Sequence, residues 1–218
     1  MHVIYCATRN LYGDLRKTSR SLLEHNNAQL HVICEDDRIE GINATCYNFS
    51  RQTFFKRTDY FLTVMCMARL AAPDLIDADR ALYLDVDTIV CGDLTELYNI
   101  DMAGKWFAAV PELPWRWNPF NHERYYNAGV LLMNLRQMRA DNAGAELIKA
   151  VNRFPYRFAE QDAINDMAYD KVVPLPTKYN ESLCTGMTTE PVIVHYAGIR
   201  NWQSGNIIRK EYRDRYFL

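Results

Sequence analysis

ALYLDVDTIV, residues 81–90, decides the fold of this chain. Its apolar run predicts a strand buried on both faces, as in parallel sheets covered by helices. Asp85 and Asp87 interrupt the run where the strand should end, and on extended backbone both side chains point to one side, about 6 to 7 Å apart. Burying two unpaired carboxylates is costly, and a divalent cation would offset that cost. Open α/β sheets bind ligands beyond the carboxyl ends of their strands, so the stretch predicts a cation site there.

The segments on either side alternate between strand-like and helix-like patterns, which favours a mainly parallel sheet flanked by helices. We expect strands over residues 2–7, 29–34, 42–49, 107–113, 126–135, 172–176 and 192–196. We expect helices over residues 13–25, 58–70 (ended by Pro73), 141–153 and 160–169, and a final helix in the basic and aromatic tail. With 218 residues and no low-complexity linker, residues 1–218 are expected to form one α/β domain.

Composition excludes several classes of function. Hydrophobic residues make up 49% of the chain and the formal net charge is −2, so neither disorder nor general attraction to nucleic acid is expected. No apolar run approaches the roughly 20 residues of a membrane span, and Met1 leads directly into a strand-like segment without signal-peptide features. A cytoplasmic protein is expected, with at most weak peripheral membrane contact by the tail. Its oligomeric state is not predicted.

A cytoplasmic location also bears on two residue types. The six cysteines form no CxxC pair and lie mostly among apolar neighbours, which predicts free buried thiols. The sequons at Asn43, Asn48 and Asn180 are expected to be chance matches, because the glycosylation machinery would not meet them.

The pair of aspartates admits more than one interpretation. Carboxylate oxygens favour Mg²⁺ or Mn²⁺, and Mn²⁺ gains if a histidine joins, for which His195 at the end of VIVHY is the candidate. Alternatively, the aspartates form an exposed strand end that makes turn contacts. Phosphatases of the haloacid dehalogenase type also carry DxD, but their motif continues to a threonine where this chain has Ile89.

Five ordered stretches together resemble glycosyltransferase family 8, over nearly the whole chain. They are MARL (67–70), YLDVDTIV (83–90), YYNAGVLLMNL (125–135), EQDAIN (160–165) and HYAG (195–198). The resemblance implies a Rossmann-like domain of the GT-A type. It also implies retaining transfer of a hexosyl group from a nucleoside diphosphate sugar, UDP-glucose or UDP-galactose, to a glycan or lipid-linked saccharide acceptor.

The resemblance also assigns residues. It implies that the cation, Mn²⁺ or Mg²⁺, is held by Asp85, Asp87 and His195. It implies that the nucleotide sugar is bound by Ala7, Thr8, Asn10, Tyr12, Arg69, Asp85, Val86, Asp87, Asn127, Ala128, Gly129, Gly198 and Arg200. Gln161 falls near the anomeric carbon and is a poor nucleophile, which favours same-face attack by the acceptor. Glu160 or Asp162 as a carboxylate nucleophile is the rival.

Two departures from the family pattern affect the nucleotide cradle. Arg9 stands where the family has an acidic residue that could accept from a uracil N–H, and Asn201 stands where it has a lysine. Arg200 is a candidate for the missing positive charge at the diphosphate. These departures support an alternative, a degenerate relative that serves as a nucleotide-sugar-binding partner subunit. The acceptor is expected at an aromatic loop that contains Trp115, Trp117 and Phe120.

Overall fold

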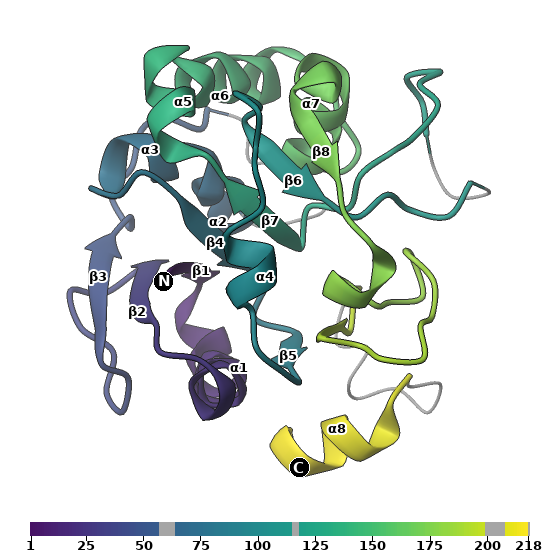
Figure 1. Cartoon of the computed structure of the whole chain (residues 1–218). Coiled ribbons are helices and arrows are strands. Elements are labelled where there is room, and N and C mark those ends of the chain that lie inside the picture. The colour runs from purple at the N-terminus through teal and green to yellow at the C-terminus, as the bar shows by residue number, and fades with distance from the viewer. Residues whose placement is uncertain (57–63, 115–117, 199–207, 218) are drawn as a thin grey trace.

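The computed structural model describes residues 1–56, 64–114, 118–198 and 208–217. A seven-stranded sheet with the order β3-β2-β1-β4-β7-β6-β8 forms the centre of the molecule (Figure 1). Its strands are β1 (His2–Ala7), β2 (Gln29–Cys34), β3 (Ala44–Asn48), β4 (Ala81–Leu84), β6 (Phe107–Ala109), β7 (Val130–Met133) and β8 (Val172–Pro174). A separate two-stranded sheet pairs β5 (Thr88–Val90) with β9 (Ile193–His195).

The first half of the large sheet is parallel and the second half is mixed. β3, β2, β1 and β4 pair in parallel, β7 pairs antiparallel with both β4 and β6, and β6 pairs in parallel with β8. The predicted mainly parallel α/β sheet is therefore confirmed. The carboxyl ends of β1, β2 and β4 open on one edge of the sheet, which is where doubly wound folds bind their ligands.

Helices cover both faces of the sheet (Figure 1). The α-helices are α1 (Tyr12–His25), α2 (Val64–Met67), α3 (Ala72–Leu75), α4 (Thr95–Tyr98), α5 (Leu135–Ala140), α6 (Ala143–Arg153), α7 (Ala159–Met167) and α8 (Lys210–Tyr216). The 3₁₀ helices are η1 (Arg9–Leu11), η2 (Ala68–Ala71), η3 (Tyr169–Lys171) and η4 (Thr177–Tyr179).

Alternate residues of each strand enter two separate cores, as the period of a strand requires. In β1, Ile4 lies in the core that also contains Leu147 and Val151 of α6, whereas Tyr5 lies in the core with Leu15 of α1. The central strands are thus apolar on both faces, which explains the unbroken hydrophobic runs in the sequence.

The expected single strand over residues 81–90 is wrong. The chain turns after β4, and β5 pairs with β9 in the small sheet instead of continuing in the large one. The turn is closed by the Asp85 carbonyl, which accepts from the Thr88 N–H at 3.2 Å and from the Thr88 hydroxyl at 2.8 Å. The two aspartates are therefore held by a turn and not by the alternation of a strand.

Two other expectations fail at element ends. Pro73 does not end the helical segment, because it occupies the first turn of α3, where a missing N–H costs no hydrogen bond. The run over residues 126–135 yields only β7, since Asn134 caps a new helix, α5, by accepting from the Gln137 N–H at 3.2 Å. The part of the expected helix at residues 57–63 lies outside the described residues.

The other local predictions vary in outcome. All six cysteines are free, but only Cys6 and Cys34 are fully buried, and the other four are half-buried. Helix α8 packs on the domain as expected, with Tyr216 and Phe217 buried against Ile89 and Val194. Within the described part of the chain, no helix combines the length and hydropathy needed to cross a bilayer.

Candidate active site

Asp85, directly after β4, accepts hydrogen bonds from the Tyr83 hydroxyl and from the guanidinium of Arg69. The buried Arg69 of η2 places its Nη2 atom 2.9 Å from Asp85 Oδ1 and 3.2 Å from Glu160 Oε1. Its Nη1 donates to the Ala128 carbonyl, and the guanidinium lies 4.0 Å from the Tyr83 ring centroid. Arg69 is only 3% exposed. The described contacts of Arg69 are therefore with protein groups, and its contact with a donor stays a prediction.

His195 completes a cluster with the two aspartates. Its Nε2 atom lies 3.3 Å from Asp87 Oδ1 and 3.8 Å from Asp85 Oδ2. One ligand atom from each of the three residues falls within 4.8 Å of the other two. The antiparallel register explains the approach, because β5 places Thr88 opposite His195 directly after the DxD turn. The structure thus brings together the three side chains predicted to bind a cation.

The electrostatics of this cluster suit an added positive charge. Burial opposes the charged form of His195, yet the adjacent Asp87 and Asp85 raise the pKa of its imidazole overall. Burial also opposes the charged form of Asp87 and so raises the pKa of its carboxyl. Arg69 is the fixed cation of the cluster and is already paired with Asp85 and Glu160. Oxygen and imidazole ligands with excess negative charge fit Mn²⁺ or Mg²⁺.

Gly129 allows the imidazole to reach this position. A Cβ atom on Gly129 would lie 2.1 Å from Cε1 of His195 and 2.7 Å from both ring nitrogens, too close for any side chain. Its carbonyl also accepts from the Asp85 N–H at 2.8 Å. Gly129, the last residue of the NAG stretch (residues 127–129), is thus required by the histidine as well as by any sugar that binds beside it.

A chain of buried amides extends from His195 toward the residues predicted to contact the sugar. Asn180 Oδ1 lies 2.9 Å from His195 Nδ1, and Asn180 Nδ2 donates to Asn127 Oδ1 at 2.9 Å. Asn127 Nδ2 donates to Glu112 Oε1 at 2.9 Å, which also accepts from Gln161 Nε2 at 3.2 Å. Sequence reasoning missed Glu112 entirely and considered Asn180 only as a sequon.

The three predicted catalytic residues of α7 differ in surroundings. Gln161 accepts from the Ala128 N–H at 2.9 Å through its Oε1 atom. Glu160 is buried against Arg69, and burial raises the pKa of its carboxyl. Asp162 accepts from the backbone N–H groups of Arg157 and Phe158, each at 2.8 Å, and from the Tyr125 hydroxyl. Both oxygens of Asp162 are therefore committed to contacts within the fold, whereas the buried Glu160 Oε2 has no hydrogen-bond partner in the described part of the chain.

The first strand leads into the predicted nucleotide turn. Ala7 is buried, the Thr8 hydroxyl contacts Asn10 Oδ1 at 2.5 Å, and Tyr12 donates to Asp36 Oδ2 at 3.0 Å. Arg9 makes a bidentate pair with the same Asp36, its Nη2 atom lying 2.7 Å from Oδ1. Asp36 follows β2, so a carboxylate reaches this turn from a neighbouring strand although residue 9 is not acidic.

The remaining predicted site residues are placed less fully. The backbone of Val86 forms part of the DxD turn, and Gly198 has a φ of 112°, in the left-handed region that favours glycine. Phe120 packs among aromatic rings, its centroid 6.4 Å from that of Tyr125. Arg200, Asn201, Trp115 and Trp117 lie outside the described residues.

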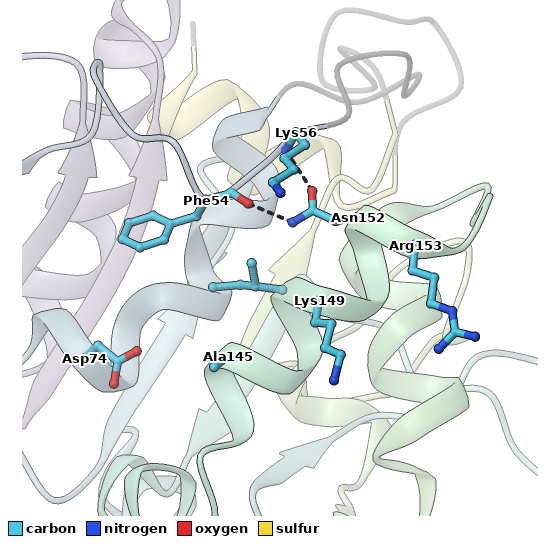
Figure 2. A pocket seen from close by; sticks show the side chains of 8 residues that line it. Phe54, Lys56, Asp74, Ala145, Lys149, Asn152 and Arg153 are labelled. Atoms are coloured by element: carbon cyan, nitrogen blue, oxygen red, sulfur yellow. Dashed lines mark hydrogen bonds between the residues drawn. The ribbon is translucent and has the colours of Figure 1, made fainter.

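A surface groove of about 470 Å³ lies apart from this cluster (Figure 2). Its lining comes from the segment after β3, from Asp74 and from α6, and contains none of the predicted site residues. In Figure 2, Asn152 ties the groove together: it accepts from the Lys56 N–H and donates to the Phe54 carbonyl, both at 2.7 Å. The groove therefore lies between α6 and the segment that follows β3, and it is not part of the predicted site.

Comparison with solved structures agrees with this architecture. The fold is similar to that of the galactosyltransferase LgtC in complex with donor and acceptor sugar analogs, with a TM-score of 0.75 and 20% identity over 100% of this chain and 97% of that chain. It is also similar to the glycosyltransferase GlyE of Streptococcus pneumoniae TIGR4, with a TM-score of 0.76 and 20% identity over 100% of this chain and 60% of that chain. Both likenesses show a GT-A fold.

Sequence comparison shows the family. The chain is 25% identical to general stress protein A of Bacillus subtilis (strain 168), over 100% of this chain and 92% of that protein. It is 28% identical to a putative glycosyltransferase of Haemophilus influenzae, over 97% of this chain and 78% of that protein. Residues 3–204 match the model for glycosyl transferase family 8, a span that contains the DxD turn, the NAG stretch and His195. This chain therefore belongs to glycosyltransferase family 8 and is a glycosyltransferase.

Proposed function

We propose that this glycosyltransferase moves a hexosyl group, with retention and with a bound Mn²⁺ or Mg²⁺, from UDP-glucose or UDP-galactose to a saccharide acceptor. The observation that carries the proposal is the cluster of the half-buried Asp85 and Asp87 with the buried His195, whose ligand atoms lie within 4.8 Å of one another. Glycan and lipid-linked saccharides are the expected acceptors, and the chain acts as one catalytic domain in the cytoplasm.

The division of work among the residues follows from their positions. Asp85, Asp87 and His195 would hold the cation, with Arg69 fixing the orientation of Asp85. When bound, the cation supplies positive charge that stabilises the departing diphosphate. The side-chain amides of Asn127 and Gln161 both donate to Glu112 Oε1, so this carboxylate orients the two amides that are predicted to contact the sugar.

Same-face attack by the acceptor is the mechanism that the surroundings of α7 favour. A double displacement requires a carboxylate free to attack the anomeric carbon. Glu160 is 3% exposed and paired with Arg69, and Asp162 is 1% exposed with both oxygens hydrogen-bonded. Asp162 therefore has no free oxygen, and Glu160, although its Oε2 accepts no hydrogen bond within the described residues, is buried against Arg69. This burial disfavours both carboxylates as nucleophiles and leaves Gln161 as a positioning amide.

Uridine as the base is supported by the position of Asp36. Its carboxylate lies beside Tyr12 and Arg9 at the end of β2, next to the predicted nucleotide turn. Both of its oxygens already accept from Arg9 or Tyr12, so Asp36 would accept from a base N–H by exchanging one of these hydrogen bonds.

The experiment is hydrolysis of a panel of nucleoside diphosphate sugars with Mn²⁺, with Mg²⁺ and with a chelator. We expect turnover of one uridine sugar that requires metal, and a loss of at least ~10²-fold for Asp87→Asn, typical of one electrostatic stabiliser. The double variant Asp85→Ala, Asp87→Ala should be inactive. An unchanged rate in Asp87→Asn contradicts the metal assignment, and silence across the panel without nucleotide binding contradicts the enzyme assignment.

A further inference from the structure

Asn180 is a fully buried residue that touches both sides of the candidate site. It follows η4, has 0% exposure, and contacts His195 with one end of its amide and Asn127 with the other. Each end of a buried amide has a fixed hydrogen-bonding role, because its oxygen can only accept and its NH₂ group can only donate.

The roles of these groups can be assigned from the backbone. The Gly129 N–H can only donate, and it lies 3.0 Å from Asn127 Oδ1, so that atom is an acceptor. The other end of the Asn127 amide donates to the Glu112 carboxylate at 2.9 Å, which confirms the orientation independently. The Asn180 atom that lies 2.9 Å from Asn127 Oδ1 must therefore be its NH₂ group.

The orientation of the Asn180 amide determines which nitrogen of the His195 ring carries the hydrogen. With its NH₂ group turned to Asn127, Asn180 presents its oxygen to His195 Nδ1 at 2.9 Å. An oxygen acceptor requires that Nδ1 carries the hydrogen. The other ring nitrogen, Nε2, lies 3.3 Å from Asp87 and 3.8 Å from Asp85, on the side of the predicted cation.

We infer that Asn180 is a positioning residue that holds His195 as its Nδ1–H tautomer and directs the Nε2 lone pair toward the cation site of Asp85 and Asp87. The inference rests on the proposed function only in what it assigns to Nε2. Hydrogen bonds from the second ring nitrogen of a ligating histidine commonly set its tautomer and orientation, and their loss typically weakens metal binding by about 10- to 100-fold.

Asn180 also joins the metal side to the sugar side. Its NH₂ group restrains Asn127, whose own NH₂ group shares Glu112 Oε1 with Gln161. The acceptor end of Asn180 thus serves the cation site, while its donor end serves the residues predicted to contact the sugar. Substitutions that remove one end at a time can separate these two effects.

The first test reads the tautomer directly. The measurement is a long-range ¹H–¹⁵N correlation spectrum of protein labelled with ¹⁵N-histidine. It is recorded at a pH high enough that the His195 signals no longer change with pH, where the ring is neutral. The spectrum then reports which ring nitrogen is protonated. The His195→Gln variant assigns the signals. We expect a protonated Nδ1, and a protonated Nε2 overturns the inference. This measurement needs no metal, so it remains decisive even if the protein binds no Mn²⁺ and the proposed metal function fails.

The second test measures Mn²⁺ affinity from the loss of the free-ion electron paramagnetic resonance signal. Asn180→Leu, which keeps the branched shape of the side chain and removes both polar ends, should weaken Mn²⁺ binding about 10- to 100-fold. Asn180→Asp keeps an acceptor for His195 Nδ1 and loses the donor to Asn127, so it should not weaken Mn²⁺ binding, because a carboxylate also serves as a partner of a ligating histidine. It should raise KM for the uridine sugar.

The matched control is Asn26→Leu, at another buried asparagine, which contacts the backbone of Gly92 and Leu94 and lies outside the amide chain. It should lose stability without changing Mn²⁺ affinity. Wild-type affinity in Asn180→Leu overturns the inference, and so does equal weakening in Asn180→Asp. If Asn180→Leu does not fold, Asn180→Asp and the tautomer measurement still decide.

Discussion

The position of one imidazole ring depends on a residue that has no side chain. His195 lies directly over Gly129, so close that any Cβ there would overlap Cε1. The same glycine accepts from the Asp85 N–H and donates to Asn127 Oδ1. Gly129 therefore contacts a predicted metal ligand on each side, and its backbone connects the DxD turn to the amide chain.

Gly129→Ala should displace the imidazole and abolish metal binding. A Cβ at 2.1 Å cannot be relieved by rotation of the ring alone, because both ring nitrogens would also lie 2.7 Å away. We expect activity to fall by at least ~10²-fold, the typical loss for an electrostatic stabiliser, together with weaker Mn²⁺ binding. Gly13→Ala in α1 is the matched control, since no atom lies within 4 Å of a Cβ there. Retained Mn²⁺ affinity in Gly129→Ala contradicts the arrangement.

At the scale of elements, β2 carries a buried histidine between two neighbouring strands. His31 contacts His2 of β1 at 2.9 Å and the Tyr47 hydroxyl of β3 at 3.0 Å. Burial, assisted by His2, lowers the pKa of His31 from 6.5 to about 4. The unfolded chain therefore takes up a proton before the folded one does as pH falls.

This shift predicts a loss of stability in acid. The contribution of His31 is complete above pH 6.5, declines as pH falls toward about 4, and falls no further below that value. Linkage sets its ceiling at about 3 kcal/mol. His31→Gln, which retains hydrogen-bonding capacity but does not titrate, should flatten the pH dependence of unfolding by urea. Parallel curves for the two proteins in that range contradict the shift.

A second element-scale contact joins α6 to η2, the helix that carries Arg69. A Cβ on Gly144 would lie 2.8 Å from the Leu70 carbonyl oxygen, a backbone atom that cannot move without shifting η2. Gly144→Ala should therefore destabilise the protein by about 1–3 kcal/mol through overpacking, despite the better helix propensity of alanine. Urea unfolding measures this cost. A stabilised variant shows that the two helices can separate freely.

Elements that bury a continuous apolar face could be predicted from the sequence, whereas their interruptions could not. β1, β2, α1, α6 and α7 follow from periodicity because each has one uninterrupted pattern. The break after Leu84 depends on hydrogen bonds that close a turn on Thr88, and the start of α5 depends on a cap at Asn134. Apolar residues resume after each junction, at Ile89 and at Leu135, so the hydropathy pattern extends both strands too far.

The same limit applies to the candidate site. Asp85, Asp87 and His195 stand in recognisable stretches, and their approach follows once β5 pairs with β9. Glu112, Asn180 and Asp36 reach the site from three other parts of the chain, in stretches with no distinctive pattern. Residues that position others through tertiary hydrogen bonds leave no trace in spacing, and only the fold reveals them.

At the scale of the whole molecule, one buried ion pair fastens the C-terminal helix to the strand that bears His195. Glu181 is 0% exposed and lies beside β9. Its backbone N–H donates to the Ile193 carbonyl at 2.9 Å, and its backbone carbonyl accepts from the His195 N–H at 2.8 Å. Its carboxylate is 2.6 Å from Arg209 Nε and 3.1 Å from Nη2. Arg209 directly precedes α8 and its carbonyl also accepts from the Tyr196 hydroxyl at 3.0 Å.

Removal of Arg209 alone should be more damaging than removal of the whole pair. Arg209→Leu leaves the Glu181 carboxylate buried with the Thr188 N–H as its one donor among the described residues, which should cost about 3–5 kcal/mol of unfolding free energy. Glu181→Gln combined with Arg209→Leu removes the uncompensated charge and should recover a large part of that loss. Urea unfolding of the four proteins of this double-mutant cycle measures the coupling. Additive losses would show that the two side chains do not stabilise each other, whereas strong coupling shows that Arg209, just before α8, stabilises Glu181 beside the strand that presents His195.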